Sequence, residues 1–432
     1  MKILVAGAGH GGLVAAGLLA KQGHGVTVFE RNPEKDLGHD WTDIFSLKNC
    51  FNEVGIPLPE PHEYECANEM TFINPSTSAP ITARTPPERS TESKMERRAI
   101  LRHLIKFARD NGAQFVFEAA VERPLTEGKR VTGLVVAGKE IRGDLVVDSA
   151  GMHSPVRTQL PAEFGIVKEF GRMQYFTVYR AFHNDTGAPA SENYFNVYFL
   201  PLGRTGVAWA ANEKGYVDFV CGSFTNTDRA YAEEIRQYFI PRHPNLGDEI
   251  LRGGYAVDIP VRRPIGLMVA DGYAAVGDCA AMTVPLNGNG MTNAIRAGRV
   301  LAETVAAAKD ATAAALWPYQ VQYMRNWGAT AASLDVFKTF MMTVKPEVVD
   351  FLFDKHLLSP QDMENARVGN AITFTLPDLV SRGVRGAAQL PSMIKLAGAF
   401  GGSQKLMKFA KKIPDKYDEA AVKAWATKYE AM

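Results

Sequence analysis

The chain has 432 residues, of which 46% are hydrophobic and 22% charged, and its net charge is +1. This length exceeds one ordinary hydrophobic core, so we expect two or three domains. The balanced charge gives no electrostatic footprint for nucleic acid, and the apolar runs are too short for a transmembrane helix. The four cysteines lack metal-binding spacing and suit a reducing compartment, so we expect a cytoplasmic protein without a metal site.

The amino-terminal thirty residues carry the clearest motif. An apolar run meets the pattern G-x-G-x-x-G, a helical stretch follows, and a second apolar run ends in an acid. In this strand–turn–helix–strand context the glycines permit a tight turn, the approach of a pyrophosphate, and close packing of helix on strand. The terminal acid is suited to accept hydrogen bonds from ribose hydroxyls. The motif therefore predicts a dinucleotide site made by Gly7, Gly9, Gly12, Glu30 and the adjacent Arg31.

The next part of the chain alternates loop, helix and strand patterns. Residues 43–54 suit a short helix, and the proline-rich stretch 55–87 holds one strand candidate, 69–74. Apolar side chains recur at helical spacing over 96–111, where Gly112 ends the helix. Further strands are expected at 114–117, 130–137, 140–142 and 144–150.

Residues 172–255 change in character because aromatic side chains alternate along the segment. This pattern predicts an antiparallel sheet with one covered face. A helix is expected at 228–239, a short strand at 272–278 and another helix at 290–309. The remainder, 311–432, is predicted to be helical, in blocks separated by Pro346, Pro360, Pro377 and Pro391.

Two further motifs follow predicted strands. The first, DSAGMHSPVR, runs from Asp148 to Arg157, and we expect its polar residues to be structural. In the second, an aspartate follows a strand and the segment PLNGNGM opens a helix. A helix N-terminus there can stabilise negative charge on a reduced flavin ring, and the aspartate can accept a hydrogen bond from a ribityl hydroxyl. The second motif thus predicts cofactor contacts from Asp278, Pro285, Gly288, Gly290 and Met291.

In this order, the glycine motif with its terminal acid, D-x-x-G-x-x-S-x-x-R and G-D…P-x-x-G-x-G resemble the para-hydroxybenzoate hydroxylase and geranylgeranyl reductase superfamily of FAD-dependent oxidoreductases. The stretch GDCAAMTVPLNGNGMTNAIRAG is most similar to the geranylgeranyl reductase branch. The resemblance covers about residues 1–301. It implies an α/β fold with a glutathione-reductase-type Rossmann FAD domain, an antiparallel substrate-domain sheet and a helical carboxy-terminal extension. It also implies that Arg97 contacts the linker of the flavin.

We expect the FAD-binding domain to be discontinuous in sequence. It comprises residues 1–60, 88–160 and 256–310. Residues 61–87 and 161–255 are expected to form the substrate domain, and 311–432 the helical carboxy-terminal region.

The resemblance implies two alternative activities. One is the reduction of carbon–carbon double bonds in a hydrophobic, isoprenoid-like substrate by hydride transfer from flavin N5. The other is an FAD-dependent monooxygenase, a hydroxylase or epoxidase acting through a flavin C4a-hydroperoxide. Typical hydroxylases carry a histidine where Ala281 stands, and residues 196–203 keep the Pro-x-Gly of the reductase signature without its Trp and Phe. No catalytic residue is predicted.

The aromatic segment 194–199 is expected to line a substrate cavity, with Tyr198, Leu200 and Pro201 among its walls. The sequence contains one strand–G-x-G-x-x-G–helix unit, so electrons are expected from transient NAD(P)H or from another donor, such as a partner protein. The basic stretch 405–412 suits either an amphipathic helix in peripheral contact with an anionic membrane or an ordinary packing helix with a solvated face.

Overall fold

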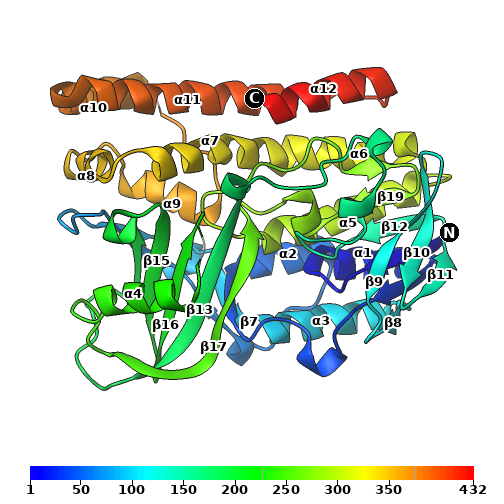
Figure 1. The fold of residues 1–432 in the computed structure, drawn as a ribbon, viewed down its shortest axis with the longest axis horizontal. Coiled ribbons are helices and arrows are strands. Elements are labelled where there is room, and N and C mark those ends of the chain that lie inside the picture. The colour runs from blue at the N-terminus through cyan, green and yellow to red at the C-terminus, as the bar shows by residue number, and fades with distance from the viewer. Residues whose placement is uncertain (226, 375) are drawn as a thin grey trace.

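The computed structural model describes residues 1–225, 227–374 and 376–432. Figure 1 shows an α/β unit beside a large twisted antiparallel sheet, with α6 and α7 running across both. The helices α10, α11 and α12 form the outermost layer, which covers α6 and α7 on the side away from the sheets.

A six-stranded sheet forms the centre of the α/β unit in the described chain, in the order β18–β19–β12–β1–β2–β8. Its pairs are parallel except for the edge strand β18, which runs antiparallel to β19. The central strands are almost continuously apolar, as expected for a parallel sheet that is buried on both faces. The bounds are Lys2–Ala6 for β1, Gly25–Phe29 for β2, Gln114–Val116 for β8, Leu145–Asp148 for β12, Val269–Ala270 for β18 and Tyr273–Ala275 for β19.

Helices α1 (His10–Lys21), α3 (Arg97–Asp110) and α5 (Met291–Ala307) pack around this sheet, and α2 (Leu47–Val54) packs on α5. The crossing of α1 over α5 is unusually close because it is made by glycines. A Cβ atom on Gly298 would lie 2.3 Å from the carbonyl oxygen of Gly11. This contact fixes how the N-termini of α1 and α5 lie relative to each other.

The second large sheet contains seven described strands in the order β17–β13–β16–β15–β14–β5–β6. Its pairs are antiparallel except for β14 with β5. Helix α4 (Arg229–Phe239) covers one face, and α7 and α8 lie on the other. The bounds are Glu69–Ile73 for β5, Ile81–Arg84 for β6, Tyr175–Asp185 for β13, Phe195–Phe199 for β14, Gly206–Glu213 for β15, Tyr216–Ser223 for β16 and Leu246–Pro260 for β17.

Two small sheets complete the β structure of the described residues. The strands β3 (Thr42–Phe45), β7 (Ser93–Glu96) and β4 (Tyr64–Cys66) form one, with β7 in the middle. The other has β10 (Arg130–Val136) between β9 (Val121–Glu127) and β11 (Lys139–Arg142). The first of these sheets bridges the α/β unit and the seven-stranded sheet.

The carboxy-terminal third is helical, as the sequence predicts. The prolines at 346, 360, 377 and 391 stand in the first turns of α8, α9, α10 and α11, where a missing N–H costs nothing. The bounds are Ala313–Tyr323 for α6, Ala329–Thr343 for α7, Pro346–Asp354 for α8, Pro360–Val368 for α9, Leu376–Gly386 for α10, Leu390–Lys411 for α11 and Glu419–Ala431 for α12.

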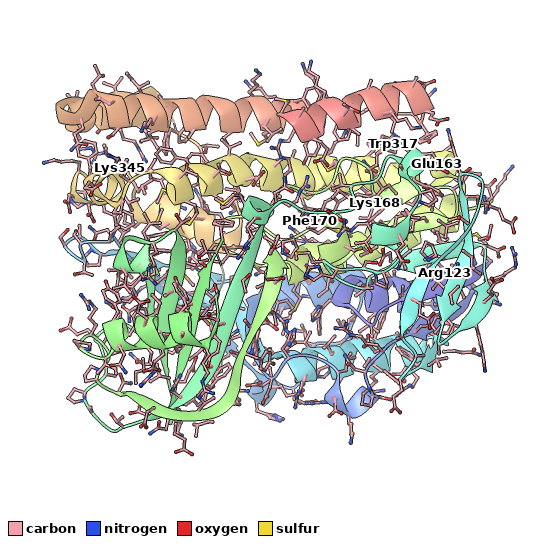
Figure 2. All side chains as sticks on the ribbon, in the orientation of Figure 1. Arg123, Glu163, Lys168, Phe170, Trp317 and Lys345 are labelled. Carbon is pink, nitrogen blue, oxygen red and sulfur yellow. The ribbon has the colours of Figure 1, made fainter. Side chains whose placement is uncertain are left out.

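Specific contacts hold the outermost helices to the body. Trp317 of α6 lies beneath this layer (Figure 2), and its Nε1 donates to the carbonyl of Pro414, 2.8 Å away, between α11 and α12. Near the end of α12, Glu430 pairs with the buried Arg262 and accepts the N–H of Gly266 at 2.6 Å. These contacts make the outer layer an integral part of the fold.

The predicted fold class is confirmed, with local differences. The stretch 43–54 begins in strand β3 before the helix, because residues 42–45 pair with β7. The strand β9 was not predicted, and β17 continues to Pro260, five residues beyond the predicted antiparallel segment. The predicted domain boundaries remain a prediction.

Candidate active site

A cavity of about 440 Å³ lies between the α/β unit and the seven-stranded sheet. Its lining on the α/β side includes residues 9–11 and 285–291. Its lining on the opposite side comes from β13–β16, α7 and α9. The cavity therefore joins both glycine motifs to a wall of apolar side chains.

The first glycine motif shapes the N-terminus of α1. Gly7 has a φ of +82°, and its N–H donates to the carbonyl of Phe29 at 2.8 Å, which closes the turn. The N–H of Gly12 donates to Ser149 Oγ at 3.1 Å, and a Cβ on Gly12 would lie 2.5 Å from the Cβ of Ser149. Gly9 is the N-cap residue and has no side chain of its own to cap the helix, so Ser149 takes the N–H of Gly12 while those of His10 and Gly11 stay available. Available N–H groups at a helix N-terminus facing a cavity are suited to bind an anion.

Glu30 lies buried at the end of β2, beside this turn. Its Oε2 accepts the N–H of Ala8 at 3.0 Å, and its Oε1 accepts the N–H of Asn32 at 2.9 Å. The carboxylate therefore holds the glycine turn in place. Arg31 is exposed, and neither Arg31 nor Glu30 is among the described residues that line the cavity.

The second glycine motif brings a second helix N-terminus to the same cavity. Asp278, Pro285, Gly288, Gly290 and Met291 all line it. A Cβ on Gly290 would lie 3.2 Å from Asp278 Oδ1, so glycine keeps the approach to this carboxylate open. Burial raises the pKa of Asp278, while the positive charge of Arg97 opposes that shift.

Arg97 is also in the cavity wall, where it pairs with Asp43. Its Nε and Nη2 each donate to the Asp43 carboxylate at 2.6 Å. Burial disfavours a charged Asp43, but Arg97 outweighs it and holds the pKa of Asp43 below its usual value. Burial and Arg97 together lower the pKa of His10 to about 4, so this imidazole is neutral.

These residues fit a flavin dinucleotide. The N-termini of α1 and α5 face one cavity, and the glycines there let the loops pack closely, since a Cβ on Gly9 would lie 2.5 Å from Ser149 Oγ. His10 and Trp41 line this cavity, and their buried Nε2 and Nε1 atoms have no hydrogen-bond partner among the described residues. Unpaired buried polar atoms are costly, so their presence here favours a polar ligand.

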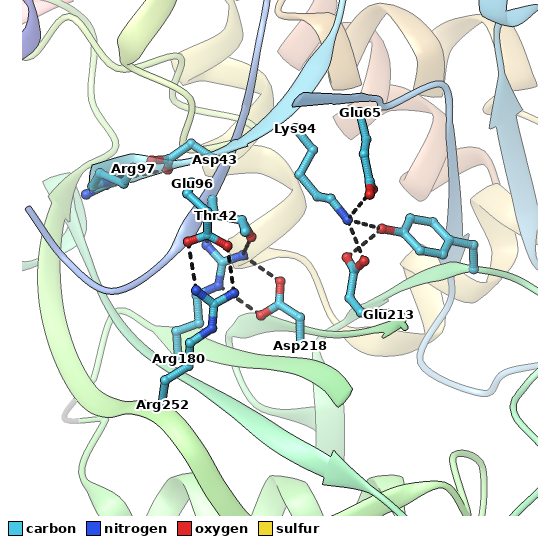
Figure 3. Close-up of polar contacts among 11 residues, drawn as sticks. Thr42, Asp43, Glu65, Lys94, Glu96, Arg97, Arg180, Glu213, Asp218 and Arg252 are labelled. Carbon is cyan, nitrogen blue, oxygen red and sulfur yellow. Dashed lines mark hydrogen bonds and ion pairs between the residues drawn. The ribbon is translucent and has the colours of Figure 1, made fainter. Parts of the chain in front are cut away.

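Ion pairs clamp the small sheet to the seven-stranded sheet (Figure 3). Arg180 of β13 is held by Asp218 of the neighbouring strand β16 at 2.9 and 2.5 Å, and its Nη1 reaches the small sheet, where it donates to the carbonyl of Thr42 at 2.7 Å. Lys94 of β7 pairs with Glu213 of β15. Because these cations and anions neutralise one another, the charged groups in the wall serve the fold and leave the cavity suited to an apolar ligand.

The wall opposite the glycine motifs is strongly apolar. Alternate residues of β14 face the cavity, and α7 and α9 supply further side chains. The apolar side chains that line the wall include Phe176, Val178, Phe195, Val197, Phe199, Val207, Trp209, Phe337, Met341, Met342 and Met363.

The prediction that Tyr198 lines this wall is wrong. Tyr198 points to the other face of the sheet, where its hydroxyl lies 2.9 Å from His243 Nε2 and its ring centroid 4.6 Å from that of Phe239. Leu200 and Pro201 also lie outside the described cavity lining. Leu200 instead joins an apolar cluster with Val349 and Phe353 of α8, since the chain turns sharply after β14.

Glu92 is a wall residue that the sequence analysis missed. Of the described carboxylates in the lining, Asp43, Glu213 and Asp218 are in ion pairs, and Asp258 and Asp278 accept hydrogen bonds from threonines. Glu92 has no ion-pair partner in the described part of the chain, and burial raises its pKa to about 7, although the charge of Arg367 and a hydrogen bond from Thr91 oppose that rise. No sequence pattern marks Glu92, because its environment comes from distant elements.

The other sequence candidates are structural. Asp148 accepts hydrogen bonds from Ser154 and from Tyr273. Burial raises the pKa of the Cys50 thiol to about 12. Among the described residues no cluster of histidines, cysteines and carboxylates could hold a metal ion, and none of the described helices is long and apolar enough to span a membrane.

Comparison with known proteins shows the enzyme class of this chain. The family described as FAD-dependent oxidoreductase matches residues 90–304, and the family of NAD(P)-binding Rossmann-like domains matches residues 5–56. The chain is an FAD-dependent oxidoreductase with a glutathione-reductase-type fold.

The relatives of this chain show which FAD-dependent oxidoreductases its sequence resembles. The chain is similar to a digeranylgeranylglycerophospholipid reductase of Sulfolobus acidocaldarius, with 23% identity over 94% of this chain and 91% of the relative. It is similar to enzymes of the same name from Haloferax volcanii (24% identity, 86% and 93% coverage) and Methanoculleus marisnigri (24%, 74% and 81%). The predicted likeness to the geranylgeranyl reductase branch is confirmed.

Solved structures share the fold. A geranylgeranyl bacteriochlorophyll reductase-like protein from Thermoplasma acidophilum superposes with a TM-score of 0.72 at 19% identity, covering 92% of this chain and 98% of the other. A probable FAD-dependent monooxygenase from Pseudomonas aeruginosa gives 0.60 at 20% identity (82% and 99% coverage). A flavin-dependent brominase gives 0.61 at 13% identity (90% and 97% coverage).

Proposed function

We propose that this oxidoreductase binds FAD along the two glycine motifs and reduces carbon–carbon double bonds in a hydrophobic, isoprenoid-like substrate. One observation carries the proposal: a single cavity joins the N-termini of α1 and α5 to a wall of aromatic, aliphatic and methionine side chains. Relatives named for the reduction of digeranylgeranylglycerophospholipids support this substrate class.

Each part of the cavity has a distinct task in this proposal. The free N–H groups at the N-terminus of α1 bind the pyrophosphate, and Glu30 keeps the glycine turn in shape next to the adenosine ribose. Asp278 accepts a hydrogen bond from the ribityl chain, and Arg97 contacts that linker. The N-terminus of α5, at Met291, favours negative charge on the flavin ring.

The apolar wall binds the substrate chain and excludes water. When bound and reduced, FAD supplies a hydride. Completing the reduction of an alkene also requires a proton. Glu92 lies in the wall and retains its proton up to about pH 7, so it is suited to hold the proton that the second carbon receives.

The electron donor and the location complete the proposal. We propose that NAD(P)H binds transiently, or that a partner protein delivers electrons, since the sequence has one strand–G-x-G-x-x-G–helix unit. We also propose a cytoplasmic protein in peripheral contact with a membrane, because an isoprenoid-like lipid substrate resides there.

The test is an anaerobic half-reaction. The purified protein should be yellow and release FAD on denaturation. After photoreduction without oxygen, an isoprenoid alcohol or a polyprenylated glycerophospholipid should reoxidise the flavin stoichiometrically and become saturated. A colourless protein that takes up no FAD would refute the cofactor assignment. Substrate turnover that consumes oxygen in proportion to product would instead establish a monooxygenase.

A further inference from the structure

The outermost helix layer presents an exposed apolar patch. The four most exposed large apolar side chains of the described chain are Val380 (65%), Val384 (74%), Leu390 (64%) and Ile394 (62%). All four belong to α10 or to the first turns of α11. Single exposed apolar residues are ordinary, but such a cluster marks a contact surface. We call these four residues the outer apolar patch.

The same layer is strongly basic. Residues 376–432 contain ten lysines and arginines against five aspartates and glutamates, whereas the whole chain is nearly neutral. Lys405 and Lys408 of α11, Lys412 just after its end and Lys428 of α12 surround a surface hollow that also contains Phe409. We call these four lysines the basic hollow.

Leu390 and Ile394 of the patch share one face of α11 with Lys405 and Lys408 of the hollow. Positions 390, 394, 398, 401, 405 and 408 are three or four residues apart, so they form one stripe along the helix. The opposite side of α11 is buried, with Leu396, Leu406 and Ala410 packed against the body. Figure 2 shows side chains of α11 and α12 projecting outward from this layer. A flat partner could therefore touch both groups at once.

An anionic lipid bilayer matches this surface in both respects. Apolar side chains insert between lipid tails, while lysines bind the phosphates of the headgroups. The excess positive charge is confined to the layer that carries the apolar patch, so charge complementarity selects an acidic partner. Electrostatic attraction amounts to about a fivefold gain in affinity for each lysine near an anionic surface.

The buried side of this layer adjoins the cavity. Phe400 of α11 packs on Phe337 of α7, with ring centroids 5.0 Å apart, and Phe337 lines the cavity. Met393 and Phe374 pack on the same apolar cluster, which includes the cavity residue Ile372. The helix that carries Leu390 and Ile394 thus packs, through its buried side, on residues that line the apolar part of the cavity.

We propose that the outer apolar patch and the basic hollow dock the protein on an anionic bilayer, with the apolar part of the cavity turned toward the lipid. The docking surface stands on its own observations. Its use for lipid entry rests on the proposed function.

Vesicle co-sedimentation of the FAD-loaded full chain tests the docking. We expect binding to vesicles of phosphatidylcholine with 30% phosphatidylglycerol, weak binding to phosphatidylcholine alone, and release by high salt. Lys405→Gln with Lys408→Gln and Lys412→Gln should weaken binding about a hundredfold. Val384→Ser with Ile394→Ser should weaken it at least tenfold. The matched controls are Leu251→Ser, on exposed β17, and Lys139→Gln, and both should bind as the wild type does.

The outcomes separate the two proposals. Equal binding of wild type and patch variants to anionic vesicles would overturn the docking surface, as would no binding by the wild type. A concentration-dependent dimer that Ile394→Ser abolishes, without vesicle binding, would identify a second copy as the occupant. The patch variants should reduce a short, detergent-soluble isoprenoid normally and lose turnover only of substrate held in vesicles. If the wild type binds vesicles but reduces neither substrate, the proposed function fails and the docking stands.

Discussion

The crossing of α1 over α5 offers a sharp test of how the cofactor cavity is built. Replacing Gly298 by alanine adds one methyl group in the middle of α5. That methyl would lie 2.3 Å from the carbonyl oxygen of Gly11, 3.1 Å from its carbonyl carbon and 3.2 Å from the N of Ala15. All three are backbone atoms, so no side chain can rotate away, and one helix must shift.

The size of the effect follows from these distances. Ordinary contact begins near 3.4 Å, so the helices must separate by about 1 Å. Overpacking of this kind costs about 1–3 kcal/mol, against a gain of about 1 kcal/mol from alanine's helix propensity. We expect a net loss of about 1–2 kcal/mol in the free energy of unfolding. Since both N-termini face the cavity, FAD affinity should also fall about tenfold or more.

Urea unfolding and FAD titration of the apoprotein measure the two effects. Gly398→Ala is the matched control, because Gly398 is also helical and a Cβ there would meet no described atom within 4 Å. In the control, the free energy of unfolding should rise by up to about 1 kcal/mol, and FAD affinity should equal that of the wild type. Wild-type stability and FAD affinity in Gly298→Ala would refute the idea that this glycine crossing sets the cavity.

Three further changes test the site. Glu30→Ala should weaken FAD binding about ten- to a hundredfold in fluorescence titrations, since the turn loses a charged acceptor. Tyr198→Phe should lower the free energy of unfolding by about 1–3 kcal/mol, because His243 loses its hydrogen-bond partner. Phe199→Ala should instead alter substrate preference, because Phe199 lines the cavity. A change in substrate preference in Tyr198→Phe, with none in Phe199→Ala, would place Tyr198 in the cavity. The Glu92 pKa is near 7 when folded and 4.5 when unfolded, so wild-type stability should fall as pH rises between these values. Glu92→Gln should flatten that fall, by on the order of 3 kcal/mol above pH 7, and an unchanged pH profile would contradict the assignment.

Features set by neighbours in sequence could be predicted. The glycine motif needs only the strand, turn and helix around it, and α3 shows its apolar face at helical spacing. The prolines mark helix starts because the missing N–H restricts where they fit. For the same reason the sequence alone predicts that both glycine motifs bind a cofactor, although it does not show that they meet in one cavity.

The direction of side chains on β14 could not be predicted. Aromatic rings occur at both parities of the segment, with Tyr194 and Tyr198 in one set and Phe195 and Phe199 in the other. A strand places successive side chains on opposite faces of the sheet. An error of one residue therefore assigns a side chain to the cavity when it packs against α4 on the other face. Only the packing of α4 on Tyr198 decides between them.

Contacts between segments that are distant in sequence also could not be predicted from the sequence. Lys94 meets Glu213, and Arg180 meets the carbonyl of Thr42, because the small sheet folds onto the large one. The cavity wall from α7 and α9 comes from residues more than 100 positions after β14. Each of these side chains alone suits a solvated surface or an ordinary core.

The strand order of the six-stranded sheet has a consequence for biosynthesis. β1 pairs with β2 at once, but its other neighbour, β12, is made 139 residues later, and β19 and α5 follow after about 270 and 290 residues. At about 5–20 residues per second, the nascent β1–α1–β2 unit waits roughly 15–55 s with apolar faces uncovered. FAD loading must therefore come near the end of synthesis, and production in cells should depend on chaperone capacity before it depends on FAD supply.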